Sequence, residues 1–202
     1  MEKSGILFII SAPSGAGKTS LLKNIGSKFS DLEISVSYTT REKRSKEREG
    51  KDYFFVTEKR FMELVEQDFF AEWNRVHGHA YGTSKSFLQK KISEGKDVIL
   101  DVDVTGGRNL KKIFKESSVL IFVAPPSWEE LRYRLKLRGR DTPEEIELRL
   151  KNAKDEIKWI KEYDYVIINK ELKEARKTLY SIIVAERSKT FRVISRTELF
   201  NF

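Results

Sequence analysis

The chain has 202 residues, which suits one compact α/β unit with inserted segments and is long enough to bury a substantial core. Hydrophobic residues make up 39% and charged residues 35% of the sequence, so its composition is not that of a disordered chain. The net charge of +8 favours anionic partners, which include nucleic acids, anionic membranes and nucleotides alike. The absence of cysteine excludes disulfides and thiolate metal sites.

Two further absences bear on location. The first residues show no basic and then apolar leader, and no apolar run approaches the length of a membrane span. Together with the lack of cysteine, these observations predict a cytoplasmic protein that does not contact a membrane.

The first expected element is a strand over the apolar residues 6–10, followed by a loop and a helix over about 17–28. Residues 11–19 read Ser-Ala-Pro-Ser-Gly-Ala-Gly-Lys-Thr, which resembles the phosphate-binding pattern G-x-x-x-x-G-K-S/T in its strand, loop and helix context. The alternative is a glycine-rich turn that only connects a strand to a helix. The residues expected to bind the nucleotide are Ala12, Pro13, Ser14, Gly15, Ala16, Gly17, Lys18, Thr19 and Ser20.

The chemistry of this loop follows from its residue types. Gly15 and Gly17 let backbone N–H groups approach phosphate oxygens, and the start of the following helix favours an anion. Lys18 would reach the outer phosphates, and the Thr19 hydroxyl would bind Mg²⁺. The first glycine of the pattern is replaced by Ala12, which matters only if that position needs a positive φ; the following proline favours extended geometry instead.

The middle third, residues 34–95, lacks the alternation of strands and helices found in the rest of the chain. We interpret it as an insertion with its own small sheet, so that residues 1–33 and 96–202 form the core. The expected elements are a strand over 33–38, a charged loop over 41–51, a strand over 52–56, a helix over 58–66 and a mixed segment over 69–76.

The remainder alternates apolar strands with amphipathic helices. This pattern predicts a parallel, doubly wound sheet that binds ligands at the carboxyl ends of its strands. The segment 191–202 fits no element. The expected elements are a strand over 97–104, a helix over 106–115, a strand over 118–124, a helix capped by Ser127 and ending near 137, a helix from Pro143 to about 160, a strand over 164–169 and a helix over 171–189.

Asp101 ends an apolar strand, the position from which enzymes with a phosphate loop hold Mg²⁺ directly or through water. Its alternative role is to cap a turn. Arg134, Arg138 and Arg149 surround a short connection between two predicted helices and could stabilise charge on a transferred phosphoryl group. The alternative is a solvated charged face, which we favour for Lys136 and Arg140.

A second group of phosphate-binding candidates lies in the insertion. Arg41, Arg44, Tyr53 and Tyr81 combine two guanidinium groups with two phenols, a suitable set for the phosphate of an acceptor. Taken alone, the charge run over 41–51 would be a solvated loop.

These segments together resemble guanylate kinases, in that family's order and spacing, over about residues 5–187. The matching segments are SVSYTTR at 35–41 with Arg44, GKDYFFV at 50–56, FAEW at 70–73, YGT at 81–83, LDVD at 100–103 and VAPPS at 123–127. The resemblance implies a nucleoside-monophosphate-kinase fold with a phosphate-loop core, a GMP-binding lobe over 34–95 and a lid at about 134–149.

The resemblance also implies the reaction and the roles of single residues. The γ-phosphoryl group of ATP would pass to GMP, and also to dGMP, in the presence of Mg²⁺, giving ADP and GDP. Lys18 and the lid arginines would act on the transferred group, and Asn169 would lie near the ATP base. The residues implied to bind the GMP phosphate are Arg41, Arg44, Tyr53 and Tyr81, and those implied to contact guanine are Ser37, Glu72, Thr83 and Asp103.

Elementary chemistry agrees with these roles. Guanine offers N1–H and the N2 amino group as donors to carboxylates at Glu72 and Asp103, whereas adenine presents an acceptor at N1. No general base is apparent, and a phosphate monoester needs none because its second pKa lies near about 6. The alternative for Glu72 is a surface residue beside Trp73.

Three other functions stay open at this point. A non-catalytic guanylate-kinase-like module would bind a phosphopeptide or a protein, a nucleic-acid-binding protein would use the basic charge, and a related kinase would use another acceptor. The intact phosphate loop disfavours the first, and no recognisable reader motif supports the second. We therefore expect small nucleotides as partners, without nucleic acid or membrane; the sequence does not determine the oligomeric state.

Overall fold

The computed structural model describes residues 4–23, 25–29, 31–76, 78–137, 139 and 142–196. Its larger sheet has five strands, and every neighbouring pair is parallel. The expected doubly wound α/β architecture is therefore confirmed. In spatial order the strands are β2 (Leu32–Ile34), β7 (Asp97–Asp101), β1 (Leu7–Ser11), β8 (Ser118–Ala124) and β9 (Tyr165–Ile168).

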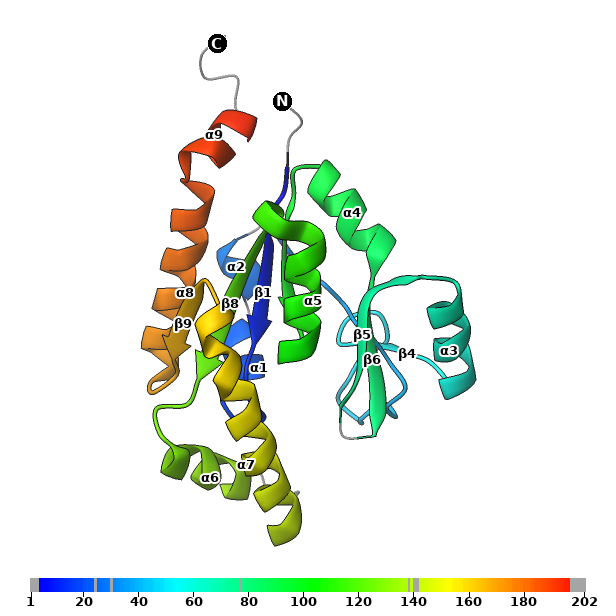
Figure 1. Ribbon diagram of the computed structural model, residues 1–202, viewed down its shortest axis with the longest axis vertical. Coiled ribbons are helices and arrows are strands. Elements are labelled where there is room, and N and C mark those ends of the chain that lie inside the picture. Colours follow the sequence, from blue (N-terminus) through cyan, green and yellow to red (C-terminus); the bar gives the residue numbers. More distant parts are fainter. Residues whose placement is uncertain are drawn as a thin grey trace.

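Apolar side chains of β1 cover both faces of this sheet because successive residues of a strand point to opposite sides. Phe8 and Ile10 belong to one buried cluster and Leu7 and Ile9 to the other, and all four are fully buried. Figure 1 shows α8 and α5 on opposite sides of β1 and β8. The first cluster is covered by α1 (Lys18–Leu22), α2 (Ile25–Lys28) and α8 (Leu172–Arg187), and the second by α4 (Lys85–Ser93) and α5 (Val104–Phe114).

A second sheet of four strands lies beside the first, with helix α3 (Glu58–Glu66) on its far side (Figure 1). Its β5–β6 and β3–β6 pairs are antiparallel, and its β3–β4 pair is parallel. Phe61 and Leu64 of α3 pack on Phe70 and Ala80 of the sheet. In spatial order the strands are β4 (Phe54–Phe55), β3 (Tyr38–Thr39), β6 (His79–Ser84) and β5 (Phe70–Val76).

The strand expected over 33–38 is wrong as a single element. Its first residues belong to β2 of the larger sheet, and Tyr38 begins β3 of the second sheet. Ser35 still donates its N–H to the carbonyl of Ile99 at 2.9 Å before the chain passes from one sheet to the other. Alternation of side chains continues through this passage, and it does not indicate with which sheet each residue pairs.

Other boundaries differ by smaller amounts. The helix expected over 17–28 is described as α1 and α2, because the backbone at Lys23 turns to ψ 127° and leaves the helical region. The strand expected over 97–104 ends at Asp101, and the following helix α5 already begins at Val104. The helix starts there because the Asp103 carboxylate caps it by accepting a hydrogen bond from the N–H of Gly106 at 3.0 Å.

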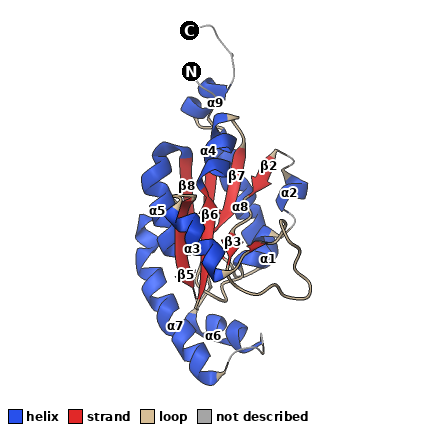
Figure 2. Ribbon diagram, turned by 90° about the vertical axis from the view of Figure 1, so that its right-hand side faces the viewer, coloured by secondary structure: helices blue, strands red, loops and turns tan. Residues whose placement is uncertain are grey.

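The two helices that follow β8 begin as their caps predict. Ser127 Oγ accepts the N–H of Glu130 at 3.2 Å, and Thr142 forms a reciprocal capping box with Glu145. Figure 2 shows α6 (Trp128–Leu137) and α7 (Pro143–Ile157) together at the end of the molecule opposite to α9. The 3₁₀ turn η2 (Lys158–Glu162) follows α7, where the sequence predicted continued α-helix to about 160. A second 3₁₀ turn, η1 (Lys115–Ser117), precedes β8.

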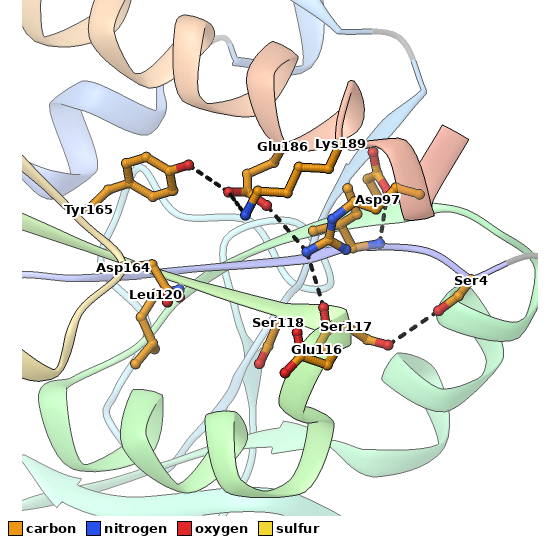
Figure 3. Close-up of polar contacts among 12 residues, drawn as sticks. Ser4, Asp97, Glu116, Ser117, Ser118, Leu120, Asp164, Tyr165, Glu186 and Lys189 are labelled. Carbon is orange, nitrogen blue, oxygen red and sulfur yellow. Dashed lines mark hydrogen bonds and ion pairs between the residues drawn. The ribbon is translucent and has the colours of Figure 1, made fainter. Parts of the chain in front are cut away.

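Helix α9 (Thr190–Arg196) occupies a segment for which the sequence predicted no element, and residues 197–202 lie outside the described residues. Two buried carboxylates hold it at the amino end of the sheet, Asp97 at 2% and Glu186 at 1% exposure. Asp97 accepts a hydrogen bond from the N–H of Ile6 at 2.8 Å and forms an ion pair with Arg196 of α9. Glu186 accepts the hydroxyl of Tyr165 at 2.6 Å (Figure 3).

Among the described residues, no helix combines the length and the apolar character that crossing a bilayer requires.

We predict that Asp97→Ala destabilises the protein by about 3 to 5 kcal/mol, because it leaves the guanidinium groups of Arg187 and Arg196 without their buried carboxylate. Urea unfolding followed by circular dichroism measures this loss. Glu63→Ala is the matched control, since its ion pair with Arg60 is exposed, and it should change stability by less than about 1 kcal/mol. Equal effects of the two substitutions would contradict the anchoring role of Asp97.

Candidate active site

A cleft of about 290 Å³ lies at the carboxyl ends of β1 and β7, where the larger sheet meets the second one. It gathers predicted residues that are far apart in the chain and come from both sheets. Glu156, Val76 and Val102 also line it, and the sequence had not indicated them. The predicted residues that line the cleft are Ala12, Pro13, Ser14, Gly15, Gly17, Lys18, Thr19, Ser37, Tyr53, Glu72, Tyr81, Asp101 and Asp103.

The loop over 12–19 has the conformation that its glycines permit. Gly15 has φ 94° and Gly17 has φ 93°, values in the left-handed region that side chains disfavour. A Cβ atom on Gly17 would lie 2.4 Å from the amide nitrogen of Asn169. Among the described residues other than glycine, only Asp68 and Lys115 have a positive φ, so Ala12 replaces the first glycine of the pattern without strain.

Two predicted residues hold this loop from outside the cleft. Asn169 is buried, and its side-chain amide donates to the carbonyl of Ala16 at 2.7 Å. Arg134 donates to the same carbonyl at 3.4 Å and to the carbonyl of Asn169 at 2.9 Å, while its Nε pairs with Glu130. In this state both residues therefore fix the course of the loop and do not line the cleft.

Two other arginines were predicted for the lid, and of these only Arg149 lies within the described residues. Arg149 of α7 donates from Nη1 to Ser14 Oγ at 2.9 Å, so it contacts the phosphate loop at a different residue from Arg134. Arg138 lies outside the described residues, as does Arg140. Ser20 is exposed on α1 and does not line the cleft.

Lys18 turns across the end of β7. Its Nζ lies 2.6 Å from Asp101 Oδ1 and donates to the carbonyl of Val102 at 2.7 Å. The parallel register that pairs Ile10 with Asp101 makes this contact possible, because both strands end at the same edge of the sheet. The Thr19 hydroxyl belongs to an exposed residue in the same cleft.

Arg41 is ion-paired on the side of the second sheet. Its Nη2 lies 2.7 Å from Glu47 Oε1, and its guanidinium stands 5.4 Å from the ring centre of Tyr53. The rings of Tyr53 and Tyr81 meet edge to face with centroids 5.9 Å apart. Burial favours a higher pKa for Glu47, but its hydrogen bonds from the Arg41 side chain and the Arg44 backbone lower the pKa. The side chain of Arg44 is exposed.

Glu47 is a residue of the site that no pattern in the sequence indicated. It stands in a run of charged residues, where no spacing distinguishes it from the glutamates at 42 and 49.

The other end of the cleft holds two carboxylates. Glu72 is 7% exposed, and the fully buried Thr83 donates its hydroxyl to Glu72 Oε1 at 2.6 Å. Burial raises the pKa of the Glu72 carboxyl to about 7, and the neighbouring charge of Asp103 adds to this effect. Gly106 gives this side chain room, because a Cβ atom there would lie 2.5 Å from Glu72 Oε2.

Asp103 has a partner that the sequence analysis did not single out. Asn74 of β5 donates its side-chain amide to Asp103 Oδ1 at 3.3 Å, and the N–H of Gly106 donates to the same oxygen. Asn74 thus links the second sheet to the start of α5 and restricts the Asp103 carboxylate. The contact arises from packing between segments 29 residues apart, so no local pattern could have revealed it.

The comparisons with known proteins agree with this geometry. The family model described as guanylate kinase matches residues 4–186, which include the phosphate loop, both sheets and both helices that flank the 138–141 connection. The chain belongs to the guanylate kinase family.

Curated relatives and a solved structure extend the match to nearly the whole chain. The guanylate kinase of Polaromonas sp. is 49% identical over 94% of this chain and 91% of its own length. That of Thermotoga maritima is 46% identical over 97% of this chain and 94% of its own length. The crystal structure of guanylate kinase from Anaplasma phagocytophilum has a TM-score of 0.77 at 33% identity, covering 95% of this chain and 91% of that one.

We predict that Gly17→Ala lowers turnover on the order of 100-fold, because the loop must shift away from Asn169 and its N–H groups lose their alignment. Gly26→Ala is the control. Among the described residues, apart from its chain neighbours and its own helix backbone, no heavy atom lies within 4 Å of a Cβ at that helical glycine. The variant should therefore keep full turnover and gain up to about 1 kcal/mol of stability. Steady-state kinetics decides, and unchanged turnover in Gly17→Ala would show that the loop conformation is not required.

Proposed function

We propose that this member of the guanylate kinase family transfers the γ-phosphoryl group of ATP to GMP, giving ADP and GDP, with Mg²⁺ bound at Thr19 and Asp101. The observation that carries the proposal is the single cleft in which a phosphate-binding loop faces two carboxylates suited to guanine. Neither feature would be sufficient alone. The loop by itself indicates only that a nucleotide binds, and the carboxylates by themselves indicate only a ligand that carries hydrogen-bond donors. We also infer that dGMP is accepted and that the protein works in the cytoplasm.

The donor triphosphate binds at the loop over 12–19. Its backbone N–H groups and the start of α1 face the phosphate oxygens, and Lys18 supplies a mobile ammonium group. Arg149 approaches the loop at Ser14, close enough for its guanidinium to reach the transferred group after the lid moves. Asn169 and Arg134 support the loop at the carbonyl of Ala16, so they position the triphosphate indirectly, through the backbone of the loop.

The residues present fit Mg²⁺. The Thr19 hydroxyl and the Asp101 carboxylate are both hard oxygen ligands in the cleft, and Asp101 keeps 36% of its side chain exposed. The described residues contain no group of three or more histidine or acidic side chains that could hold a metal alone. Phosphate oxygens and water would complete the coordination, and the ion would neutralise charge on the β- and γ-phosphates.

The acceptor phosphate binds where Arg41 is now paired with Glu47. A phosphate dianion can replace Glu47 on the guanidinium, with hydrogen bonds from the hydroxyls of Tyr53 and Tyr81. Arg44 would reach the same group from its exposed position. The exchange of one anion for another avoids leaving a desolvated guanidinium without a partner.

Guanine binds between Glu72, Asp103 and Ser37 in the same cleft. Glu72 accepts a hydrogen bond from Thr83, which fixes one carboxylate oxygen and leaves the other for guanine. Asn74 restricts Asp103 in the same way. Adenine would leave these buried acceptors unpaired, and such a mismatch discriminates by roughly 10⁴ to 10⁵.

The chemical step needs alignment and exclusion of water more than proton transfer. The acceptor phosphate is largely ionised at neutral pH, so its oxygen attacks without a general base. We propose that residues 34–95 form the GMP-binding lobe and residues 134–149 the lid, and that both close over the core residues 1–33 and 96–202. Closure brings the two phosphates into line and removes water between them.

The experiment that tests this function is a coupled assay of ADP release with GMP, AMP, CMP and UMP in the presence of Mg²⁺. We expect turnover with GMP and values lower by roughly 10⁴ with AMP. Lys18→Ala should reduce turnover with GMP by a factor on the order of 10² to 10³ without unfolding the protein. Folded protein that releases no ADP with GMP, or equally with every monophosphate, would contradict the proposal.

Glu72 gives a second test through pH. Its pKa rises from 4.5 to about 7 on folding, so the native state binds the proton more tightly and loses stability as pH increases through this range. We predict that Glu72→Gln gains about 2 to 3 kcal/mol of stability relative to the original protein between pH 5 and pH 8. The same variant should bind GMP much more weakly and ATP unchanged.

Denaturant titrations at each pH measure the difference in unfolding free energy, and calorimetry measures nucleotide binding. Other titrating groups are common to both proteins and cancel in the difference. Stability curves that stay parallel from pH 5 to pH 8, or equal loss of GMP and ATP binding, would show that Glu72 is not the buried guanine acceptor.

A further inference from the structure

Glu156 is a cleft residue to which the reaction described above gives no role. It lies next to the last residue of α7 and reaches the cleft from the helix that follows the lid connection. It also lines an adjoining pocket of about 310 Å³ together with Asn74, Asp103 and Arg149. The side chain therefore stands where the core, the second sheet and α7 meet.

The Glu156 side chain is half-buried, and its carboxylate has no hydrogen-bond donor in the part of the chain that the structure describes. The groups that act on its charge are Lys18, which is attractive, and Asp103, which is repulsive. Lys18 is already held at 2.6 Å by Asp101 and at 2.7 Å by the carbonyl of Val102. A half-buried carboxylate without a donor from the protein is incompletely compensated, so this position favours a ligand that donates hydrogen bonds.

The proposed positions of the base and the phosphate of GMP determine which group of this nucleotide can lie beside Glu156. With guanine at Glu72 and Asp103 and the phosphate at Arg41, the ribose has to lie between these two ends of the cleft. The lining residues without a role in base, phosphate or metal binding are Val76, Val102 and Glu156. Among them only Glu156 has a polar side chain, and the backbone carbonyl of Val102 already accepts from Lys18.

We propose that Glu156 accepts the 2′-hydroxyl of the GMP ribose and is the residue that makes this enzyme prefer GMP to dGMP. The inference rests on the proposed function, because it takes the positions of base and phosphate from it. A carboxylate oxygen is a strong acceptor for a hydroxyl in a site from which water is removed. A site built around such a bond disfavours the analogue that lacks the hydroxyl.

The test compares kcat/KM for GMP and dGMP in the original protein, in Glu156→Ala and in Glu156→Gln. We expect a preference for GMP of roughly 10-fold or more in the original protein. In Glu156→Ala the value for GMP should fall about 10-fold, while that for dGMP changes less than about 3-fold, so that the preference largely disappears. Glu156→Gln keeps an acceptor oxygen in the same shape and should retain part of the preference.

Glu147→Ala is the matched control on the same helix, since Glu147 is exposed and pairs with Arg132 on the surface. It should leave the ratio of GMP to dGMP unchanged. Equal losses for both substrates in Glu156→Ala would overturn the proposal, because they would mean that Glu156 acts only on Lys18 or on the fold. No preference in the original protein would overturn it as well.

Binding measured by calorimetry separates this inference from the proposed function. Affinities of GMP and dGMP in the absence of ATP give the same ratio without turnover. If the original protein binds GMP but releases no ADP, the proposed function fails, and the ratio of affinities still decides the role of Glu156. Circular dichroism of each variant confirms that the compared proteins are folded.

Discussion

The contact between Lys18 and Asp101 depends on the parallel pairing of β1 with β7, which also fixes the edge of the sheet where the cleft lies. The register that places Ile10 beside Asp101 brings the phosphate loop and the carboxylate that we propose to bind Mg²⁺ to one edge of the sheet. Without a nucleotide, the ammonium group needs a counter-charge, because its side chain is only 17% exposed. Asp101 supplies that charge at 2.6 Å and can exchange it for Mg²⁺ and phosphate.

Arg41 repeats this arrangement on the acceptor side. It is held by Glu47 at 2.7 Å, so Lys18 and Arg41, two of the cations that we propose to meet phosphates, are each paired with a carboxylate of the protein itself. Binding then exchanges partners and does not create or bury an isolated charge. Such an exchange lets two anionic nucleotides approach each other in a cleft without a large fixed excess of positive charge.

Glu72 and Glu156 differ from Lys18 and Arg41, because neither carboxylate has an ion-pair partner among the described residues. Glu72 is buried and Glu156 is half-buried, and Asp103 acts on the charge of both. Desolvation raises the pKa of each to about 7. Their charge is best compensated by hydrogen-bond donors of a ligand, which guanine and ribose possess. We therefore expect the same residues to reduce the stability of the empty protein and to increase its selectivity, as happens where binding sites store unfavourable interactions.

Much of the larger sheet could be predicted, since its buried strands are continuous apolar runs and the phosphate loop has a specific pattern. The passage between the two sheets at 35–37 could not, because alternation there is compatible with either sheet. The sequence and the family resemblance indicated Glu72 and Asp103, whereas Asn74 and Glu156 follow only from packing between distant segments. Helix α9 was also missed, because its anchors are ion pairs to Asp97 and Glu186 and not an apolar face.

We propose that the cleft aligns two phosphates and excludes water between them. The most direct measurement follows the label of γ-labelled ATP during turnover with Mg²⁺, with and without GMP. We expect one label to appear in GDP for each ADP formed, and little label to be released without GMP. Label released mainly as inorganic phosphate, at the same rate with and without GMP, would contradict it.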